Sequence, residues 1–162
     1  MDLSEKFILD ACCGGRMMGF EKKHKNALYC DIRSIEKGTI QHENWECKPD
    51  IIADYKDLPF EDESFNLILW DIPHLIKDGT GIINKKYGHL GENWESDTTK
   101  GFNCIWKKLK NNGVLIFKYN DLNIKVSEML KLFHTKPLFG TISKKGVNNT
   151  YFFTFMKIDQ NK

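Results

Sequence analysis

Four aspartates occur where apolar runs of the sequence end, and their carboxylates could together bind a ligand. Asp10 closes FILD, Asp31 closes ALYCD, Asp54 lies near the end of DIIADY, and Asp71 closes FNLILWD. Any one of them alone could cap a helix or stabilise a turn, since aspartate is common at such positions. If the runs are parallel strands, however, their carboxyl ends meet at one edge of a sheet, where ligands bind. Four acids at one edge favour a shared ligand site.

The first apolar run is followed by a glycine turn, DACCGGR, at residues 10–16. Gly14 and Gly15 allow a tight backbone path and leave amide groups accessible to a ligand. The spacing is not G-x-G-x-x-G, so the turn is weak evidence for a dinucleotide. Asp31 follows about 20 residues later at a strand end, a position at which a carboxylate binds ribose hydroxyls. Together the turn and Asp31 indicate an adenosine-type ligand without selecting a cofactor.

The tetrapeptide Asp71-Ile72-Pro73-His74 indicates which cofactor, through its resemblance to a known motif. It resembles the D/N/S-P-P-Y/F/W/H motif of class I S-adenosylmethionine-dependent methyltransferases that act on amines. The turn DACCGGR resembles the D-P-F-C-G-S-G form of the same branch. More narrowly, CCGGRMMGF, CDIR, DLPFEDESF, WDIPHL, KKYGHL, ENW and LIFKYND together resemble a family of small methyltransferases common in bacteria and phages.

The resemblance implies S-adenosyl-L-methionine as the cofactor and gives each matching position a role. The first turn would face its methionine half, Asp31 its ribose, and Asp54 with Leu58 its adenine. The residues expected to bind the cofactor are Asp10, Cys12, Cys13, Gly14, Gly15, Asp31, Ile32, Asp54, Leu58 and Asp71. The expected catalytic residues are Asp71, Pro73 and His74.

The residue types in DIPH suit methyl transfer to a conjugated amine. Such a nitrogen has a delocalised lone pair, and two acceptors on its protons draw the lone pair back onto nitrogen. Asp71 would be one acceptor, and the backbone carbonyl of Ile72 or Pro73 the other. His74 would stack on the ring, as aromatic groups commonly do with extruded bases. Catalysis would then rest on orientation and electrostatics, without a metal.

Two residues depart from the family pattern. Ile72 replaces the first proline of D-P-P-H, which weakens the expected rigidity of the loop, although Pro73 still fixes one φ angle. Arg16 stands where a glycine is usual, and it would either crowd the methionine end or pair with its carboxylate.

The methyl acceptor is left open by the sequence. An amine of a nucleic-acid base, in DNA or RNA, is the leading interpretation. Transfer to a small molecule or a protein glutamine is the alternative, and a cofactor-binding subunit without catalysis is another. The missing G-x-G-x-x-G spacing disfavours an NAD-type oxidoreductase.

The elements that must position these residues follow from the apolar pattern. Strands are expected over 7–13, 27–32, 50–55, 65–71 and 114–120, with a turn at 111–113 before the last of these. The tail NTYFFTFMKI predicts a strand buried on both faces, which pairs antiparallel with PLFGTIS. Together the elements predict an α/β, Rossmann-like, doubly wound and mostly parallel sheet with an antiparallel C-terminal hairpin strand, in one domain over 1–162.

Helices are predicted between these strands. Phe102, Ile105, Trp106 and Leu109 form one apolar stripe. A second helix is expected over 123–132, and a stunted one over 16–26. Residues 75–97 show no clean period, and so long a loop in a compact domain is usually functional or disordered.

Composition limits the remaining options. The 162 residues carry a net charge of +2 and five cysteines without a C-x-x-C pair, which disfavours a disulfide framework or zinc ribbon. The absence of a signal or membrane segment indicates a cytoplasmic protein. Nucleic acid could be contacted through Lys144, Lys145 and the 75–97 segment, although lysine-rich faces are commonly just solvated. A dimer is permitted but not required.

Overall fold

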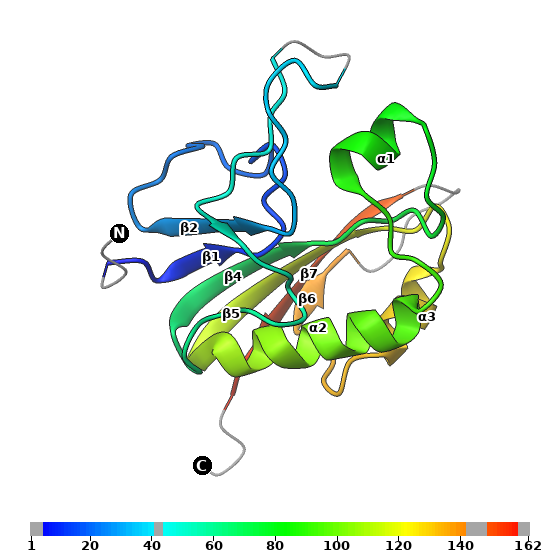
Figure 1. Ribbon diagram of the computed structural model, residues 1–162. Coiled ribbons are helices and arrows are strands. Elements are labelled where there is room, and N and C mark those ends of the chain that lie inside the picture. The colour runs from blue at the N-terminus through cyan, green and yellow to red at the C-terminus, as the bar shows by residue number, and fades with distance from the viewer. Residues whose placement is uncertain (1–4, 41–43, 142–148, 159–162) are drawn as a thin grey trace.

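The computed structural model describes residues 5–40, 44–141 and 149–158. Within these residues, seven strands form one sheet that is accompanied by three helices. Figure 1 shows their arrangement. The strands are β1 (Ile8–Asp10), β2 (Ala27–Asp31), β3 (Ile51–Ile52), β4 (Phe65–Asp71), β5 (Leu109–Asn120), β6 (Phe139–Gly140) and β7 (Thr150–Met156). The helices are α1 (Ile82–Tyr87), α2 (Trp94–Lys108) and α3 (Val126–Lys131).

The sheet has the order β3-β2-β1-β4-β5-β7-β6. β1 to β5 pair in parallel, whereas β7 pairs antiparallel with both β5 and β6. The predicted fold, a mostly parallel sheet with an antiparallel C-terminal pair, is therefore confirmed. Strand order reverses between β1 and β4, which creates a crevice outside their carboxyl ends.

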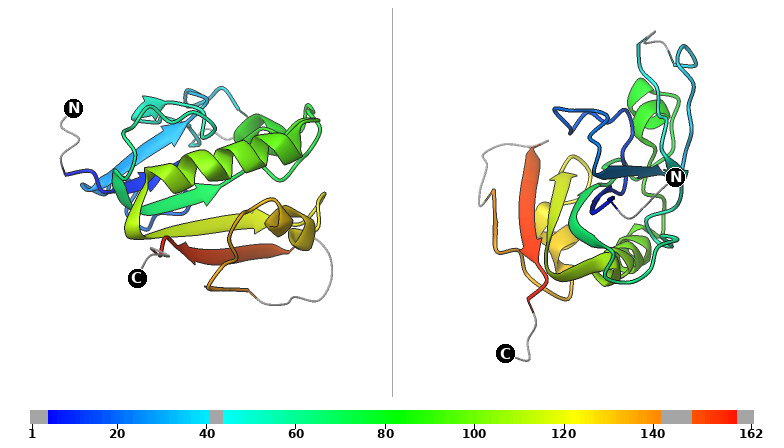
Figure 2. Two further views of the ribbon diagram at one scale, coloured as in Figure 1. Left: turned by 90° about the horizontal axis from the view of Figure 1, so that it is seen from below. Right: turned by 90° about the vertical axis from the view of Figure 1, so that its left-hand side faces the viewer.

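The core lies between one face of the sheet and the helices α2 and α3, which both pack on that face (Figure 2). Trp70 of β4 is fully buried there and contacts the rings of Phe102 from α2, Phe117 from β5 and Phe133 beyond α3. The predicted apolar stripe of α2 is thus the buried one. Leu109 is also buried, but it already belongs to β5.

The predicted turn at 111–113 lies inside β5 rather than before it. The pairing of β4 with β5 shifts register after Leu109, and Asn112 takes a positive φ of 62°. Leu109 before the turn and Val114 after it both pair with β4, so the turn forms a bulge instead of ending the strand.

Two predictions about secondary structure are wrong. Residues 16–26 form turns, not a stunted helix, because side-chain and backbone bonds hold this segment against neighbouring loops: Arg16 donates to the carbonyls of Lys22 and Lys48. β7 is not buried on both faces. Its odd-numbered aromatic residues are buried, while Phe152 on the other face is 42% exposed, since α2 and α3 cover one face only.

The segment 75–97 contains a short helix, α1, and the first residues of α2. It returns to the carboxyl edge of the sheet, where the amides of Leu90 and Gly91 donate to the carbonyls of Leu75 and Ile76. Among residues 5–40, 44–141 and 149–158, no helix has both the length and the apolar character needed to cross a bilayer.

Candidate functional site

A cavity of about 620 Å³ opens at the carboxyl ends of β1, β2 and β4, within the range typical of small-molecule sites. Its wall combines the glycine turn, the ends of β2 and β4, the segment after β3 and part of α1 with the loop that follows. The predicted site residues that line it are Cys12, Cys13, Gly14, Gly15, Asp31, Ile32, Asp54, Asp71, Pro73 and His74. Strands far apart in sequence therefore meet in one cavity.

The glycine turn begins directly after β1, and its two glycines meet different requirements. Gly14 has a φ of +46°, which is strained for a residue with a side chain, and its amide donates to Asp31 Oδ2 at 3.0 Å. A Cβ on Gly15 would approach Trp45 Nε1 to 2.7 Å. The turn is therefore held by Asp31 on one side and by Trp45 on the other. Because Gly14 and Gly15 carry no side chains, backbone atoms form this part of the cavity wall.

Arg16 points away from this cavity. Its guanidinium lies 3.8 Å from the ring centre of Tyr29 and pairs with Asp50 at 3.1 Å. Neither of the two roles considered for Arg16 from the sequence, crowding or pairing at the methionine end, matches this orientation. Since the side chain points the other way, the arginine leaves the cavity free.

Asp31 is almost fully buried and already holds the surrounding backbone. One carboxylate oxygen accepts from the Gly14 amide, and the other accepts from the Arg33 amide at 3.0 Å and lies 3.4 Å from Arg33 Nε. A carboxylate has about four acceptor positions and three donors already face this one, so one hydroxyl donor could still be accommodated. Asp31 therefore both fixes the turn and presents negative charge to the cavity.

Asp54 lies on the cavity wall beside a cation. Lys56 Nζ lies 3.6 Å from Asp54 and 2.9 Å from Asp97 at the start of α2, and its bond to Asp97 raises the pKa of Lys56. Leu58, expected beside Asp54, lies outside the cavity. It is buried in the core, where its amide faces Cys104 Sγ. The chain turns inward after Lys56, which carries Leu58 to the opposite side of the sheet edge.

Asp71 is paired with a residue that the sequence analysis missed. Lys118 Nζ lies 2.5 Å from Asp71 Oδ2, and the two residues are direct neighbours in the register of β4 and β5. Burial raises the pKa of Asp71, while Lys118 and His74 oppose that shift. No donor among the described residues bonds Asp71 Oδ1, so this oxygen can accept a bond from a ligand.

His74 lines the same part of the cavity. Desolvation lowers the pKa of its imidazole and Lys118 adds to this, whereas Asp71 raises it. The ring is therefore mainly neutral near pH 7, the form suited to stacking. Ile72 between them is buried and joins the core, so the departure from proline at this position is compatible with an anchored loop.

Asp10 lies beneath the cavity rather than on its wall. Its carboxyl is buried, and its Oδ1 has no hydrogen-bond partner among the residues that the structure describes. Desolvation, helped by the charge of Asp71, raises the pKa of Asp10 to about 7. The floor of the site thus holds a carboxyl that gains or loses a proton near neutrality and that a cation nearby would favour in its ionised form.

The wall also contains residues that the sequence analysis did not single out, among them Lys118, Arg33 and Tyr55. Lys118 could have been noticed, because a lysine inside the apolar run VLIFKYN needs a partner or an exit to solvent. The other two carry no comparable signal, since their placement depends on loops.

The irregular segment 75–97 contributes to the wall as well. Tyr87 and His89 of this segment line the cavity. Asn93 caps α2 without a side-chain bond, and Trp94 packs against the core. Lys144 and Lys145, proposed nucleic-acid contacts, lie outside the described residues.

No protein-family model matches the sequence, and no curated protein matches it. Solved structures share its fold. An N-methyltransferase, NodS, from Bradyrhizobium japonicum aligns at a TM-score of 0.58 with 9% identity, over 95% of this chain and 86% of that one. An S-adenosylmethionine-dependent methyltransferase from Methanosarcina mazei aligns at 0.57 with 10% identity, over 93% and 92%. An rRNA methylase from Streptococcus thermophilus aligns at 0.56 with 11% identity, over 95% and 88%. The chain therefore has the α/β fold of these methyltransferases.

Proposed function

We propose that this protein transfers a methyl group from S-adenosyl-L-methionine to an amine nitrogen of a nucleic-acid base. The observation that supports this most is that Asp31, expected to bind the cofactor, and His74, expected to bind the acceptor, line one cavity. A nucleoside-binding carboxylate and an acceptor-binding motif on separate surfaces could not serve one transfer.

The residues present fit the cofactor chemically. A sulfonium and an ammonium group carry positive charge, and Asp10, Asp31, Asp54 and Asp71 supply negative charge in and beneath the cavity. The positive φ of Gly14 gives the first turn a tight backbone path, which lets backbone atoms approach a bound cofactor. The unpartnered Oδ1 of Asp10 gives the floor an oxygen that a nearby cation would stabilise.

The chain's own groups would act on the acceptor. Asp71 Oδ1 accepts a hydrogen bond from the amine, while Lys118 on Oδ2 orients the carboxylate and opposes the rise in its pKa that burial causes. His74, neutral near pH 7, supports the acceptor ring. When bound, the cofactor would supply an electrophilic methyl group on sulfur. The amine nitrogen would form the new N–C bond while the electrons of the S–C bond remain on sulfur, and the amine proton would leave toward Asp71 or water. Held in line, the reactants gain mostly from orientation.

Two observations bear on the choice of acceptor. One solved structure of this fold is named an N-methyltransferase and another an rRNA methylase, which are properties of those proteins. On this chain, Arg33, Lys56 and Lys85 lie on the cavity wall and would suit an acceptor with phosphates. A planar amide of a protein glutamine or an amine of a small molecule would fit the same acceptors.

Cofactor binding is tested by calorimetry and thermal unfolding of the full chain. S-adenosyl-L-methionine should raise the melting temperature by mass action. Asp31→Asn, which keeps an oxygen acceptor for the turn, should weaken binding more than about tenfold, equivalent to about 1.4 kcal/mol. Asp62→Asn, at an exposed acid outside the cavity, serves as the matched control. No shift at millimolar cofactor would refute the cofactor assignment.

Transfer is tested by incubating the protein with methyl-labelled cofactor and separate DNA, RNA, protein and small-molecule fractions. Label should enter nucleic acid, and Asp71→Asn should remove it while cofactor binding persists. Label in the protein or small-molecule fraction would refute nucleic acid as the acceptor and identify the acceptor class instead. Cofactor binding without transfer to any fraction would indicate a non-catalytic binding subunit.

A further inference from the structure

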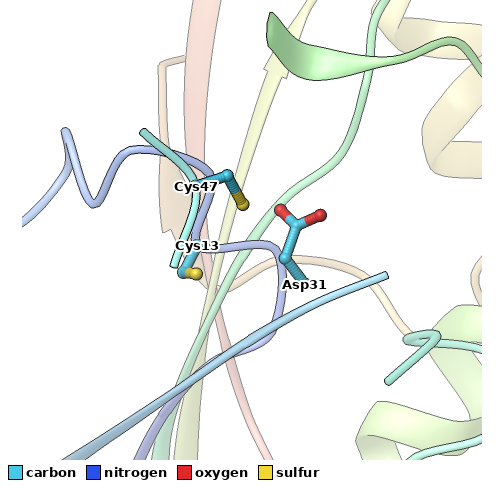
Figure 3. Close-up of side chains that lie close together, drawn as sticks. All are labelled: Cys13, Asp31 and Cys47. Carbon is cyan, nitrogen blue, oxygen red and sulfur yellow. The ribbon is translucent and has the colours of Figure 1, made fainter. Parts of the chain in front are cut away.

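Two buried cysteines and Asp31 form a cluster beside the cavity (Figure 3). Cys13 lies in the turn after β1, Asp31 ends β2, and Cys47 follows from the loop after β2. Their ligand atoms, two sulfurs and a carboxylate oxygen, all lie within 4.8 Å of one another. In Figure 3 the Cys47 sulfur and the Asp31 carboxylate point toward each other, although the three residues belong to separate segments.

Backbone hydrogen bonds hold each of these segments in place. The Cys13 amide donates to the Cys30 carbonyl at 2.8 Å, which ties the turn to β2. Cys47 exchanges two bonds with Ile35, at 2.9 and 2.8 Å, in an isolated antiparallel bridge. Asp31 is fixed by the Gly14 amide. The cluster is thus prearranged by the main chain, so a ligand need not order it.

The donor set suits a thiophilic divalent cation. Two thiolates and one carboxylate are ligands that Zn²⁺ accepts, and three protein ligands leave a fourth tetrahedral position open. Cys13 and Cys47 share a hydrogen bond between their thiols, and each sulfur also makes a weak bond to a carbonyl oxygen, at 3.7 Å from Cys13 to Gly14 and 3.4 Å from Cys47 to Arg33. Cys13 and Asp31 also line the cavity, which gives an ion a path to the cluster.

We propose that Cys13, Asp31 and Cys47 form a binding site for a thiophilic divalent cation such as Zn²⁺, and that this cation competes with the cofactor. The competition follows because both ligands use the Asp31 carboxylate, and this part rests on the proposed function. An Asp31 oxygen committed to a metal presents less negative charge to ribose hydroxyls. Metal occupancy would therefore lower methyl transfer.

The site is tested with Co²⁺ added to the reduced full-length protein. A tetrahedral site with thiolate ligands should give visible d–d bands and near-ultraviolet sulfur-to-metal charge transfer, and Zn²⁺ should abolish both. Cys47→Ser should weaken Co²⁺ binding more than about tenfold. Cys104→Ser is the matched control, at a cysteine outside the cluster, and should keep the spectrum. Equal loss in both variants, or no spectrum in the wild type, overturns the site.

Because Cys47 is fully buried, a wild-type measurement keeps the proposal testable even if the variant unfolds. The ¹¹³Cd chemical shift of the cadmium-loaded protein reports how many thiolates bind the ion. Two thiolates support the site, and one or none overturns it. Loss of two titratable thiols in the air-exposed protein, without metal binding after reduction, would identify Cys13 and Cys47 as a redox pair and overturn it as well.

Competition is measured by repeating the Co²⁺ titration with saturating S-adenosyl-L-methionine. The apparent dissociation constant for Co²⁺ should rise more than about tenfold, as expected when two ligands require one group. An unchanged constant in the presence of bound cofactor overturns the competition. Failure of the cofactor to bind at all would instead refute the proposed function, while the two spectroscopic measurements still decide the metal site.

Discussion

At the scale of single residues, the site is defined by buried carboxyls whose proton affinity depends on their neighbours. Asp71 has a cation, Lys118, within hydrogen-bonding distance. Asp10 lies within reach of other acids and has no partner for Oδ1. Asp71 and Asp10, on adjacent strands, therefore have different surroundings: a bonded cation balances the charge of Asp71, whereas no cation is bonded to Asp10 among the described residues. Environment rather than residue type assigns their roles.

The Asp10 carboxyl should make stability depend on pH. Its pKa is raised from 3.8 to about 7, so the folded state retains a proton that the unfolded chain has lost between these values. Stability is therefore lost as the pH rises through this window, by an upper bound of roughly 4 kcal/mol. Asp10→Asn should gain stability relative to wild type between about pH 4 and about pH 8, as measured by urea unfolding.

The exposed Asp62→Asn variant is the control for this measurement. Lys108 lowers the pKa of Asp62, so neutralising it should give no gain at either pH. A difference between Asp10→Asn and wild type that stays constant with pH would contradict a raised pKa at Asp10.

Lys118 should set the pH dependence of methyl transfer through Asp71. Lys118 lowers the pKa of Asp71, and the ionised carboxylate is the acceptor that the proposed reaction needs. Lys118→Met should therefore raise that pKa further and move the acidic limb of the pH–rate profile to higher pH, with rates falling more than about tenfold near pH 7. Lys118→Arg should restore most of the activity.

Lys110→Met, on the same strand but away from the cavity wall, is the matched control. A purely structural role of Lys118 would lower the rate equally at every pH. That outcome, with an unchanged profile, would remove Lys118 from the positioning of Asp71.

At the scale of elements, α2 approaches the sheet through a glycine. A Cβ on Gly101 would lie 2.4 Å from two ring carbons of Tyr55 and 3.2 Å from Trp70. Tyr55 in turn packs edge-on against Trp70 and lines the cavity. The close approach of α2 therefore links helix packing to the shape of the site.

Gly101→Ala should destabilise the protein in spite of the better helix propensity of alanine. The propensity gain is about 1 kcal/mol. Displacing the half-buried Tyr55 ring should cost more, leaving a net loss of roughly 1–3 kcal/mol in the free energy of unfolding by urea titration. Cofactor affinity should fall too, because Tyr55 moves with the helix. Lys100→Ala, on the exposed side of α2, should change stability by less than about 0.5 kcal/mol. A more stable Gly101→Ala would show that the ring yields freely.

At the scale of the whole molecule, one cavity joins segments from most of the chain. The chain places β2 and β3 on one side of β1, and β4 and β5 on the other, so the crevice lies where the order reverses. No local segment forms the site alone. A ligand bound there should therefore restrain several distant parts of the chain simultaneously.

Hydrogen exchange with and without S-adenosyl-L-methionine tests this directly. Bound cofactor should slow amide exchange in residues 11–18, 31–33, 53–56, 71–74 and 84–90, since each of these segments contributes to the cavity wall. Residues 99–108 of α2 provide the internal control and should change little. Protection limited to one segment, or found mainly in α2, would contradict a shared site.

How much of this could be predicted from the sequence depends on how local the signal is. The strands, the apolar stripe of α2 and the glycine turn follow from short patterns of apolar residues and glycines, which act over a few residues. The convergence of Asp31 and His74 also followed, since parallel strands carry their ends to one edge. The stunted helix over 16–26 failed because contacts such as those of Arg16 with distant carbonyls outweighed a weak local preference.

By itself, the sequence determined which residues end the strands and therefore which side chains could reach the carboxyl edge of the sheet. Only the tertiary structure decided which of them pair. Lys118 meets Asp71 because of the register between β4 and β5, Arg16 turns toward Asp50, and Cys47 reaches Cys13 and Asp31 through a loop-borne bridge. Such pairings depend on strand register and on the path of loops, and both are fixed by packing between segments distant in the chain, which a local pattern of residues does not encode.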